Sequence, residues 1–146
     1  MFRMSAPVTA ESAAYGWQRM VLEINLPWPS KELFQNSAAH WRTKARQVKA
    51  ARKVAFYLTL EQRPLPYFAG DISVTILIYE PDRRKRDTMN IDAAMKAAVD
   101  GIFDALKQDN KAGDDSQIRR VLTENMRKVV PGGRVTMIVE DWYPLE

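Results

Sequence analysis

The sequence predicts an α+β domain in which a mixed sheet of about four strands is flanked by two helices. Three observations predict this class. Apolar residues alternate with others in short stretches, most clearly in DISVTILIYEP, as in β-strands. Two longer stretches repeat apolar residues every three or four positions, as in amphipathic helices. The order is strand, helix, strand, helix, strand, strand, and the absence of a glycine-rich phosphate loop disfavours a doubly wound nucleotide fold.

Length and composition narrow the class of protein. The chain has 146 residues, and we expect a flexible leader over residues 1–19 followed by one domain over residues 20–146. No apolar run approaches the roughly 20 residues of a membrane span, so we expect no membrane partner. The chain has no cysteine and one histidine, His40, which excludes disulfides and zinc sites built from thiolates or several histidines. This composition fits a cytoplasmic protein.

The first part of the chain predicts one strand followed by one long helix. Val21 to Leu26 alternate like a strand that ends at two prolines. A helix is expected from Ala38 to Glu61, with Ser37 as its N-cap. Its apolar stripe is expected to pack on the sheet and consists of Trp41, Ala45, Val48, Ala51, Ala55 and Leu58. The cations of this helix fall largely off the stripe and include Lys44, Arg46 and Lys49, so a basic side should face solvent.

The second half of the chain predicts the central strand of the sheet, the second helix and two further strands. The strand over residues 72–79 is apolar on one face and half apolar on the other, so we place it centrally in the sheet. A helix should follow from Asn90 to Lys107, burying Ile91, Met95, Ala98, Ile102 and Ala105. Strands within residues 117–130 and 134–142 flank Pro-Gly-Gly, which predicts a hairpin.

Acids and cations gather next to two of these strands. Asp87 follows the central strand, and Asp114 and Asp115 precede the next one. If the two strands pair, the acids should meet at one sheet edge and could hold Mg²⁺, or Mn²⁺ in its place. The flanking cations would then bind phosphates of a nucleic acid and are Arg83, Arg84, Lys85 and Arg86. With a net charge of +4, a polyanion is a plausible partner.

The same residues have plainer interpretations. Paired aspartates before a strand are common in turns, because aspartate bonds its own backbone there. Asp87 could instead cap the second helix. Asp92, Lys96 and Asp100 are spaced four apart and could form a surface ladder of ion pairs. The basic clusters could be ordinary solvated faces.

An ordered set of motifs resembles a known family. INLPWP, HWRTKARQVKAARKVAF, PDRRKRD–MN, MKAAVDGIFDAL and GDDSQIRRV occur in this order and cover most of residues 22–140. Together they resemble the RusA family of Holliday junction resolvases, especially its phage and prophage members. The resemblance implies a small mixed sheet with two helices. It also implies a magnesium-dependent endonuclease that acts as a homodimer on four-way DNA junctions in recombination and repair, in a bacterial or phage setting. A two-fold dimer suits a two-fold junction.

The resemblance also assigns roles to individual residues. The family's first motif aspartate falls on Asp87, its catalytic lysine on Lys96, and its late aspartate on Asp115, with Asp114 beside it. The motif asparagine falls on Asn90. The second motif aspartate falls on Met89, whose thioether is a poor ligand for magnesium.

Three explanations for Met89 remain open. In the first, Asp92 supplies the missing carboxylate; in the second, the site works with Asp87, Asp114 and Asp115 alone; in the third, the protein binds junctions without cutting them. An engineered change at this position is also compatible with the sequence.

Three aromatic side chains and His40 are also considered for contact with DNA or for packing. Trp41 is interpreted as core and His40 as a cap, although both could reach DNA from the start of the basic helix. Trp28 should pack at a strand end. Phe34, in an irregular loop, could wedge between bases at a junction.

Overall fold

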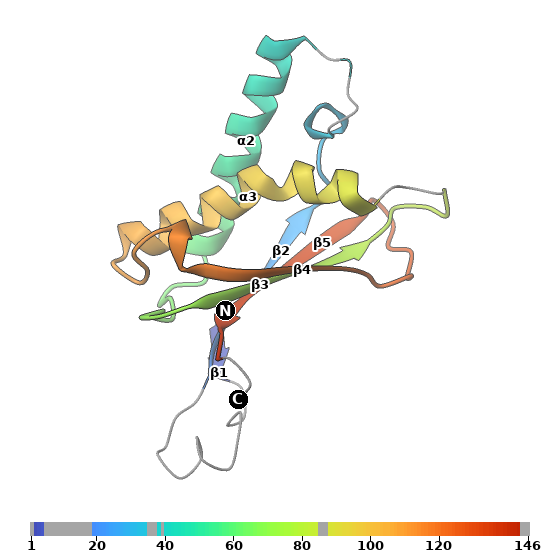
Figure 1. Cartoon of the computed structure of the whole chain (residues 1–146). Helices are drawn as coiled ribbons and strands as arrows, with labels where there is room; N and C mark the ends of the chain where they lie inside the picture. Colours follow the sequence, from blue (N-terminus) through green and yellow to red (C-terminus); the bar gives the residue numbers. More distant parts are fainter. Residues whose placement is uncertain (1, 5–18, 35–37, 39, 85–87, 144–146) are drawn as a thin grey trace.

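A computed structural model describes residues 2–4, 19–34, 38, 40–84 and 88–143, and it confirms the α+β class. Figure 1 shows both helices on one face of the sheet and no described helix on the opposite face. The sheet has five strands in the order β1-β2-β5-β3-β4. The extra strand, β1 (Phe2–Met4), pairs antiparallel with β2 inside the segment expected to be a leader. From β2 onward, the order of elements is the one predicted.

Four strands make up the body of the sheet. They are β2 (Met20–Pro27), β3 (Ile72–Tyr79), β4 (Ile118–Asn125) and β5 (Arg134–Asp141). Strand β3 is internal, as predicted, with β5 antiparallel on one side and β4 parallel on the other. Its buried face consists of Ile72, Val74, Ile76 and Ile78, each at most 2% exposed.

The predicted hairpin between the last two strands is wrong. Strands β4 and β5 do not pair, because β3 lies between them. Residues 126–133 instead cross the end of β3, where Met126 N donates to Ile78 O and Val130 N donates to Glu80 O. Gly132 and Gly133 have φ of +80° and +74°, which favours glycine, and they turn the chain into β5. The glycines therefore form a turn, as predicted, but this turn belongs to the connection that crosses the end of β3 between β4 and β5.

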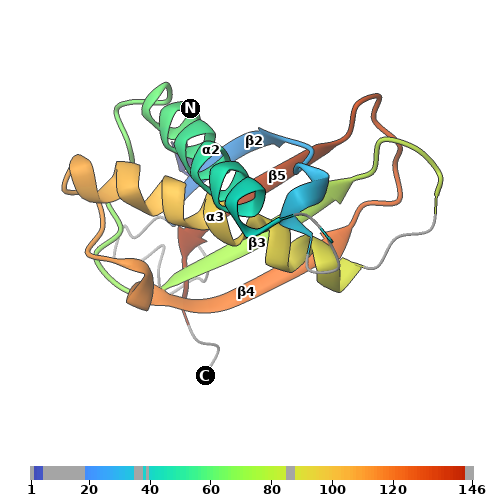
Figure 2. The same cartoon turned by 90° about the horizontal axis from the view of Figure 1, so that it is seen from above.

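Helix α3 (Thr88–Gln108) matches its prediction closely. Its predicted stripe is buried throughout, from Ile91 at 0% exposure to Ala98 at 5%. Phe103 and Leu106 extend this buried face. Figure 2, seen from above, shows α3 lying across the sheet beneath α2.

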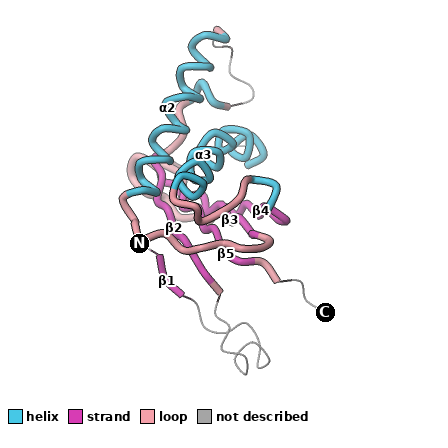
Figure 3. Tube along the Cα trace, turned by 90° about the vertical axis from the view of Figure 1, so that its left-hand side faces the viewer, coloured by secondary structure: helices cyan, strands magenta, loops and turns pink. Residues whose placement is uncertain are grey.

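Helix α2 (Trp41–Leu60) begins later than predicted and is buried much less. Its N-cap is His40, whose Nδ1 accepts from Arg42 N at 3.1 Å, while Ser37 lies outside the described residues. No residue between Trp41 and Val54 is buried, and Ala55 is the first that is. Figures 1 and 3 show why: the N-terminal half of α2 extends past α3 and away from the sheet.

The predicted burial of the first half of the α2 stripe is therefore wrong. Trp41 is 66% exposed and Val48 45% exposed, and Ala45 is exposed as well. Ala51 and Leu58 are half-buried and Ala55 is fully buried, so the second half of the stripe behaves as expected. The periodicity correctly predicted a helix but not how much of it the domain covers.

The two helices cross closely at one glycine. A Cβ at Gly101 of α3 would lie 2.1 Å from the backbone oxygen of Arg52 in α2. Beside the crossing, Arg52 Nε donates to Asp104 Oδ2 at 2.6 Å and its second nitrogen donates to Oδ1 at 2.9 Å. This bidentate pair lowers the pKa of Asp104 and raises that of Arg52.

In the described part of the chain, neither helix combines the length and apolar character needed to cross a membrane.

Candidate functional site

Asp114 and Asp115 lie at the opposite end of the sheet from the described cations Arg83 and Arg84. Because β3 and β4 are parallel, Ile118 pairs with Ile72 and Asn125 with Ile78. Asp114 and Asp115 immediately precede β4 and so lie at the end where β3 begins. Arg83 and Arg84 follow β3 and lie at the other end. At about 3.3 Å per residue, roughly 20 Å of strand separates them.

The expectation that strand pairing would bring Asp87 to Asp114 and Asp115 stays a prediction, because Asp87 lies outside the described residues. Pairing between β3 and β4 does occur, as supposed. An antiparallel pair would have joined the end of β3 to the start of β4, but the chain returns through α3 and makes the pair parallel. The structure therefore does not bring Asp114 and Asp115 to the described cations.

A polar groove of about 540 Å³ lies at the end where β3 and β4 finish. Its lining residues are Glu80, Asp82, Arg83, Asn125, Arg127, Lys128 and Val129. Asn125 Nδ2 donates to Glu80 Oε1 at 2.9 Å, and Arg84 N donates to Asp82 Oδ1 at 2.9 Å. Arg127 and Lys128 were not among the predicted site residues. They belong to the run MRKVV, which ends the strand predicted within residues 117–130 and was assigned to a hairpin.

Asp92 and Lys96 lie on α3, on the side where β3 and β4 end, and they have different bonding partners. Asp92 is exposed and accepts a hydrogen bond from the Thr123 hydroxyl of β4. Lys96 Nζ lies 3.0 Å from Asp100 Oδ1, and the lysine side chain is 71% exposed. The ladder interpretation is therefore half right, since Lys96 pairs forward with Asp100 while Asp92 bonds to the sheet.

Asp114 and Asp115 also differ. Asp114 caps the short helix η2 (Asp115–Gln117), because its side chain accepts from Ser116 N at 2.9 Å. The bonds from the Ser116 side chain and backbone lower the pKa of Asp114. The turn interpretation is confirmed for this residue. Asp115 is exposed and has no bonding partner among the described side chains, so its carboxylate is available to a ligand.

The described residues of one chain do not fit a magnesium ion. Among them, no three acidic or histidine side chains come together closely enough to hold a metal. Asp92 and Asp115 lie at different ends of the domain, as the strand register requires. The structure does not describe three of the predicted site residues, which are Lys85, Arg86 and Asp87. It also does not describe the side chains of Met89 and Asn90.

A cationic column runs along the exposed half of α2. Arg42, Arg46, Lys49 and Lys53 are spaced by four, three and four residues, so they share one face over about 16 Å of helix. Helix α2 contains no acid, and no described carboxylate pairs with Arg46, Lys49 or Lys53. Lys44, which was also predicted to bind nucleic acid, is half-buried on a neighbouring face.

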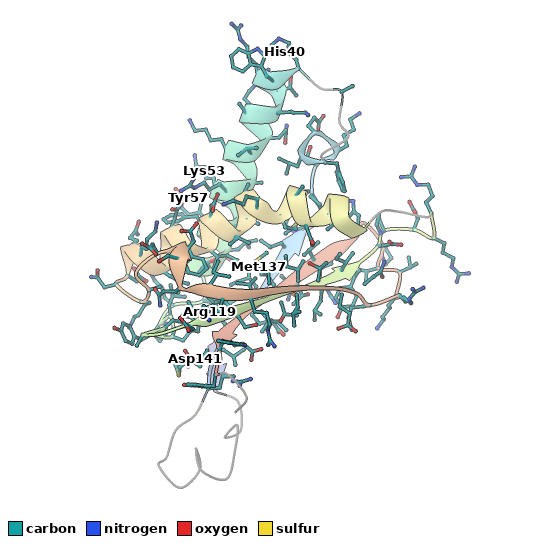
Figure 4. All side chains as sticks on the ribbon, viewed as in Figure 1. His40, Lys53, Tyr57, Arg119, Met137 and Asp141 are labelled. Atoms are coloured by element: carbon teal, nitrogen blue, oxygen red, sulfur yellow. The ribbon has the colours of Figure 1, made fainter. Side chains whose placement is uncertain are left out.

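Two rings stand at the tip of this column. The rings of His40 and Trp41 lie 5.6 Å apart, and the Arg42 guanidinium lies 5.2 Å from the centre of the Trp41 ring. In Figure 4, His40 marks the tip far from the sheet, while Lys53 and Tyr57 lie nearer to it on the same helix. The interpretation of Trp41 as core is wrong, and that of His40 as a cap is confirmed.

The other two aromatic residues pack against the domain. Trp28 and Phe34 are partly buried against the core. This confirms the packed interpretation of Trp28. It removes the exposed ring that a wedge at Phe34 would need.

The fold and these surfaces define a small α+β protein with a five-stranded mixed sheet and two helices on one face, of which α2 projects beyond the sheet and carries the cationic column. A 112-residue stretch is 32% identical to an uncharacterized protein of Xylella fastidiosa strain Temecula1, and it covers 74% of this chain and 72% of that protein. The chain therefore belongs to the same family as that protein. No family profile matches the sequence.

Proposed function

We propose that the protein is a structure-selective DNA endonuclease of the RusA kind, which acts as a homodimer on four-way junctions in the cytoplasm with Mg²⁺ or Mn²⁺ as cofactor. The observation that carries the proposal is the cationic column on α2, which is exposed and lacks described acidic partners. The order of the sequence motifs supports the nuclease chemistry.

The column suits a phosphate backbone. Its cations make no ion pair with a described acid that would have to break first, in contrast to Arg52, which pairs with Asp104. Each cation that neutralises a phosphate releases counterions, so binding should weaken steeply with salt. Trp41 at the tip offers an aromatic face for an unstacked base at a branch point.

The catalytic part of the proposal needs two chains. Asp115 lies at one end of the sheet, while Asp92, which accepts a hydrogen bond from Thr123 of β4, belongs to the other end. A second copy in antiparallel orientation would bring Asp115 of one chain towards Asp92 of the other, and the proposal assigns Asp87, which lies outside the described residues, to the same site. These carboxylates would hold the metal ion. Lys96, once released from Asp100, would face developing negative charge on the phosphate.

The test is nicking of a synthetic four-way junction. We expect Mg²⁺-dependent, symmetric nicks by the full chain, and loss of at least about 100-fold in rate in Asp115→Asn and Asp87→Asn. Glu61→Gln is the matched control, since Glu61 is an exposed acid at the far end of α2. Nicking by both aspartate variants at the rate of the unaltered protein would refute the proposed catalytic residues.

A second candidate is a junction-binding protein that does not cut. The observation that favours it is the absence of three clustered acids among the described residues, together with Met89 at a motif-aspartate position. It predicts junction binding without product in either Mg²⁺ or Mn²⁺. Met89→Asp discriminates the two, because nicking that appears only in this variant would mean that the natural chain lacks a ligand.

A further inference from the structure

Strand β4 is an exposed edge with apolar residues on it. It pairs with β3 on one side, and no described strand pairs with the other. It is a full eight residues long, and Val121 and Leu122 are 52% and 46% exposed. Long exposed edges with apolar side chains favour pairing with another strand, and proteins usually protect them.

The two faces of β4 can be told apart by their contacts. Thr123 bonds to Asp92 of α3, so odd-numbered residues from Val121 onward face the helices. Arg120 Nε donates to the Ser73 hydroxyl at 3.2 Å on the opposite face. Leu122 and Glu124 share that face with Arg120.

We infer that β4 pairs antiparallel with β4 of a second copy of this chain, with Leu122 opposite Leu122 at a two-fold axis. The pairing joins the two sheets edge to edge into one continuous sheet. It is the homodimer surface that the proposed function requires, but the argument for the pairing stands on β4 alone.

Charge complementarity selects the register. A two-fold axis normal to the sheet maps each face of the sheet onto the same face of the second copy. Opposed residues must therefore share a face, which is possible only if one residue of β4 lies opposite its own copy at the axis. Centring on Leu122 sets Arg120 opposite Glu124 twice and Val121 opposite Thr123. Centring on Val121 sets Arg120 against Leu122, and centring on Thr123 sets Arg119 against Arg127. Only the first of these three registers pairs opposite charges.

The pairing also has a consequence for the site, and this consequence rests on the proposed function. Antiparallel strands place the start of one β4 beside the end of the other, so Ile118 lies opposite Met126 of the second copy. Helix η2, which carries Asp115, immediately precedes Ile118. Asp115 of each chain thereby approaches the polar groove and the Asp92 end of the other.

A cysteine scan tests the register directly, because the chain has no cysteine of its own. Opposed residues of an antiparallel pair have Cα atoms about 5 Å apart, within the range of a disulfide. Under mild oxidation we expect Leu122→Cys to form a covalent dimer on non-reducing gels. Val121→Cys and Thr123→Cys should remain monomeric, since their copies would lie about 8 Å apart. Preferential crosslinking at position 121 or 123 would overturn the register.

A charge swap gives a second, independent readout by sedimentation without DNA. Arg120→Glu and Glu124→Arg should each weaken dimerisation about tenfold or more, because like charges then oppose each other twice. The double variant should regain the original affinity. A chain that is monomeric at tens of micromolar, or a swap without rescue, would refute the pairing. Because no DNA is present, these outcomes are independent of whether the protein cuts junctions.

Discussion

The first half of α2 and the whole of α3 have similar sequence patterns and opposite surroundings. Both repeat apolar residues every three or four positions. In α3 that stripe is buried, with Ile91 and Ile102 at 0% exposure. In α2 the stripe is exposed from Trp41 to Val48, and burial begins only at Ala55.

The two helices differ in the residues that make up and flank their stripes. The α3 stripe contains Ile91, Met95 and Ile102, whereas the α2 stripe offers only Ala45 between Trp41 and Val48. The four cations of the column also lie before Ala55, and no residue of α2 is acidic. Burying α3 stabilises the domain, while the exposed half of α2 is free to contact a partner.

Paired truncations give the largest expected difference between the two helices. Ile102→Ala should lower the free energy of unfolding by about 2–5 kcal/mol, since it removes a fully buried side chain from the core. Val48→Ala should change it by no more than about 0.5 kcal/mol. Urea denaturation of both variants measures the contrast. A loss above about 2 kcal/mol at Val48 would mean that the tip of α2 is packed.

The point where the two helices cross gives the next largest effect. Gly101→Ala should cost about 1–3 kcal/mol, because its methyl group would meet the backbone oxygen of Arg52 and push the helices apart. Gly70→Ala is the matched control, since a Cβ there meets nothing within 4 Å. Thermal melting of both variants checks the prediction. An equal melting temperature for the two would contradict the close crossing.

Local patterns predicted most of the elements, while their long-range arrangement was partly missed. The face of β3 and the stripe of α3 follow from periodicity, because an alternating or helical pattern fixes which residues share a side. Pro-Gly-Gly correctly predicted a turn. No local signal indicates that β3 inserts between β4 and β5, because strand partners are chosen by the whole sheet.

For the candidate site, the sequence likewise predicted residue types but not how the residues are arranged in space. Asp114, Asp115 and the cations were found by residue type, but their distance apart depends on whether β4 runs parallel to β3. The groove residue Lys128 belongs to the crossover that the hairpin prediction concealed. Trp41 was assigned to the core because the sequence does not reveal where α2 passes the edge of α3.

The smallest expected effect on stability falls on the cationic column, which is also where the account can be tested most directly. The triple variant Arg46→Gln, Lys49→Gln, Lys53→Gln should fold normally, because these side chains are exposed and have no described acidic partners. The matched control, Lys31→Gln, Lys107→Gln, Lys111→Gln, removes the same charge elsewhere.

The decisive measurement is the salt dependence of four-way junction binding by these two variants and the unaltered chain. If all three column cations contact phosphates, the slope of log affinity against log salt should fall by about 2.7 in the column variant, at about 0.9 per contact. The control should keep nearly the original slope. Equal losses of slope and affinity in both variants would mean that net charge alone attracts DNA, and that the projecting half of α2 is not the binding surface.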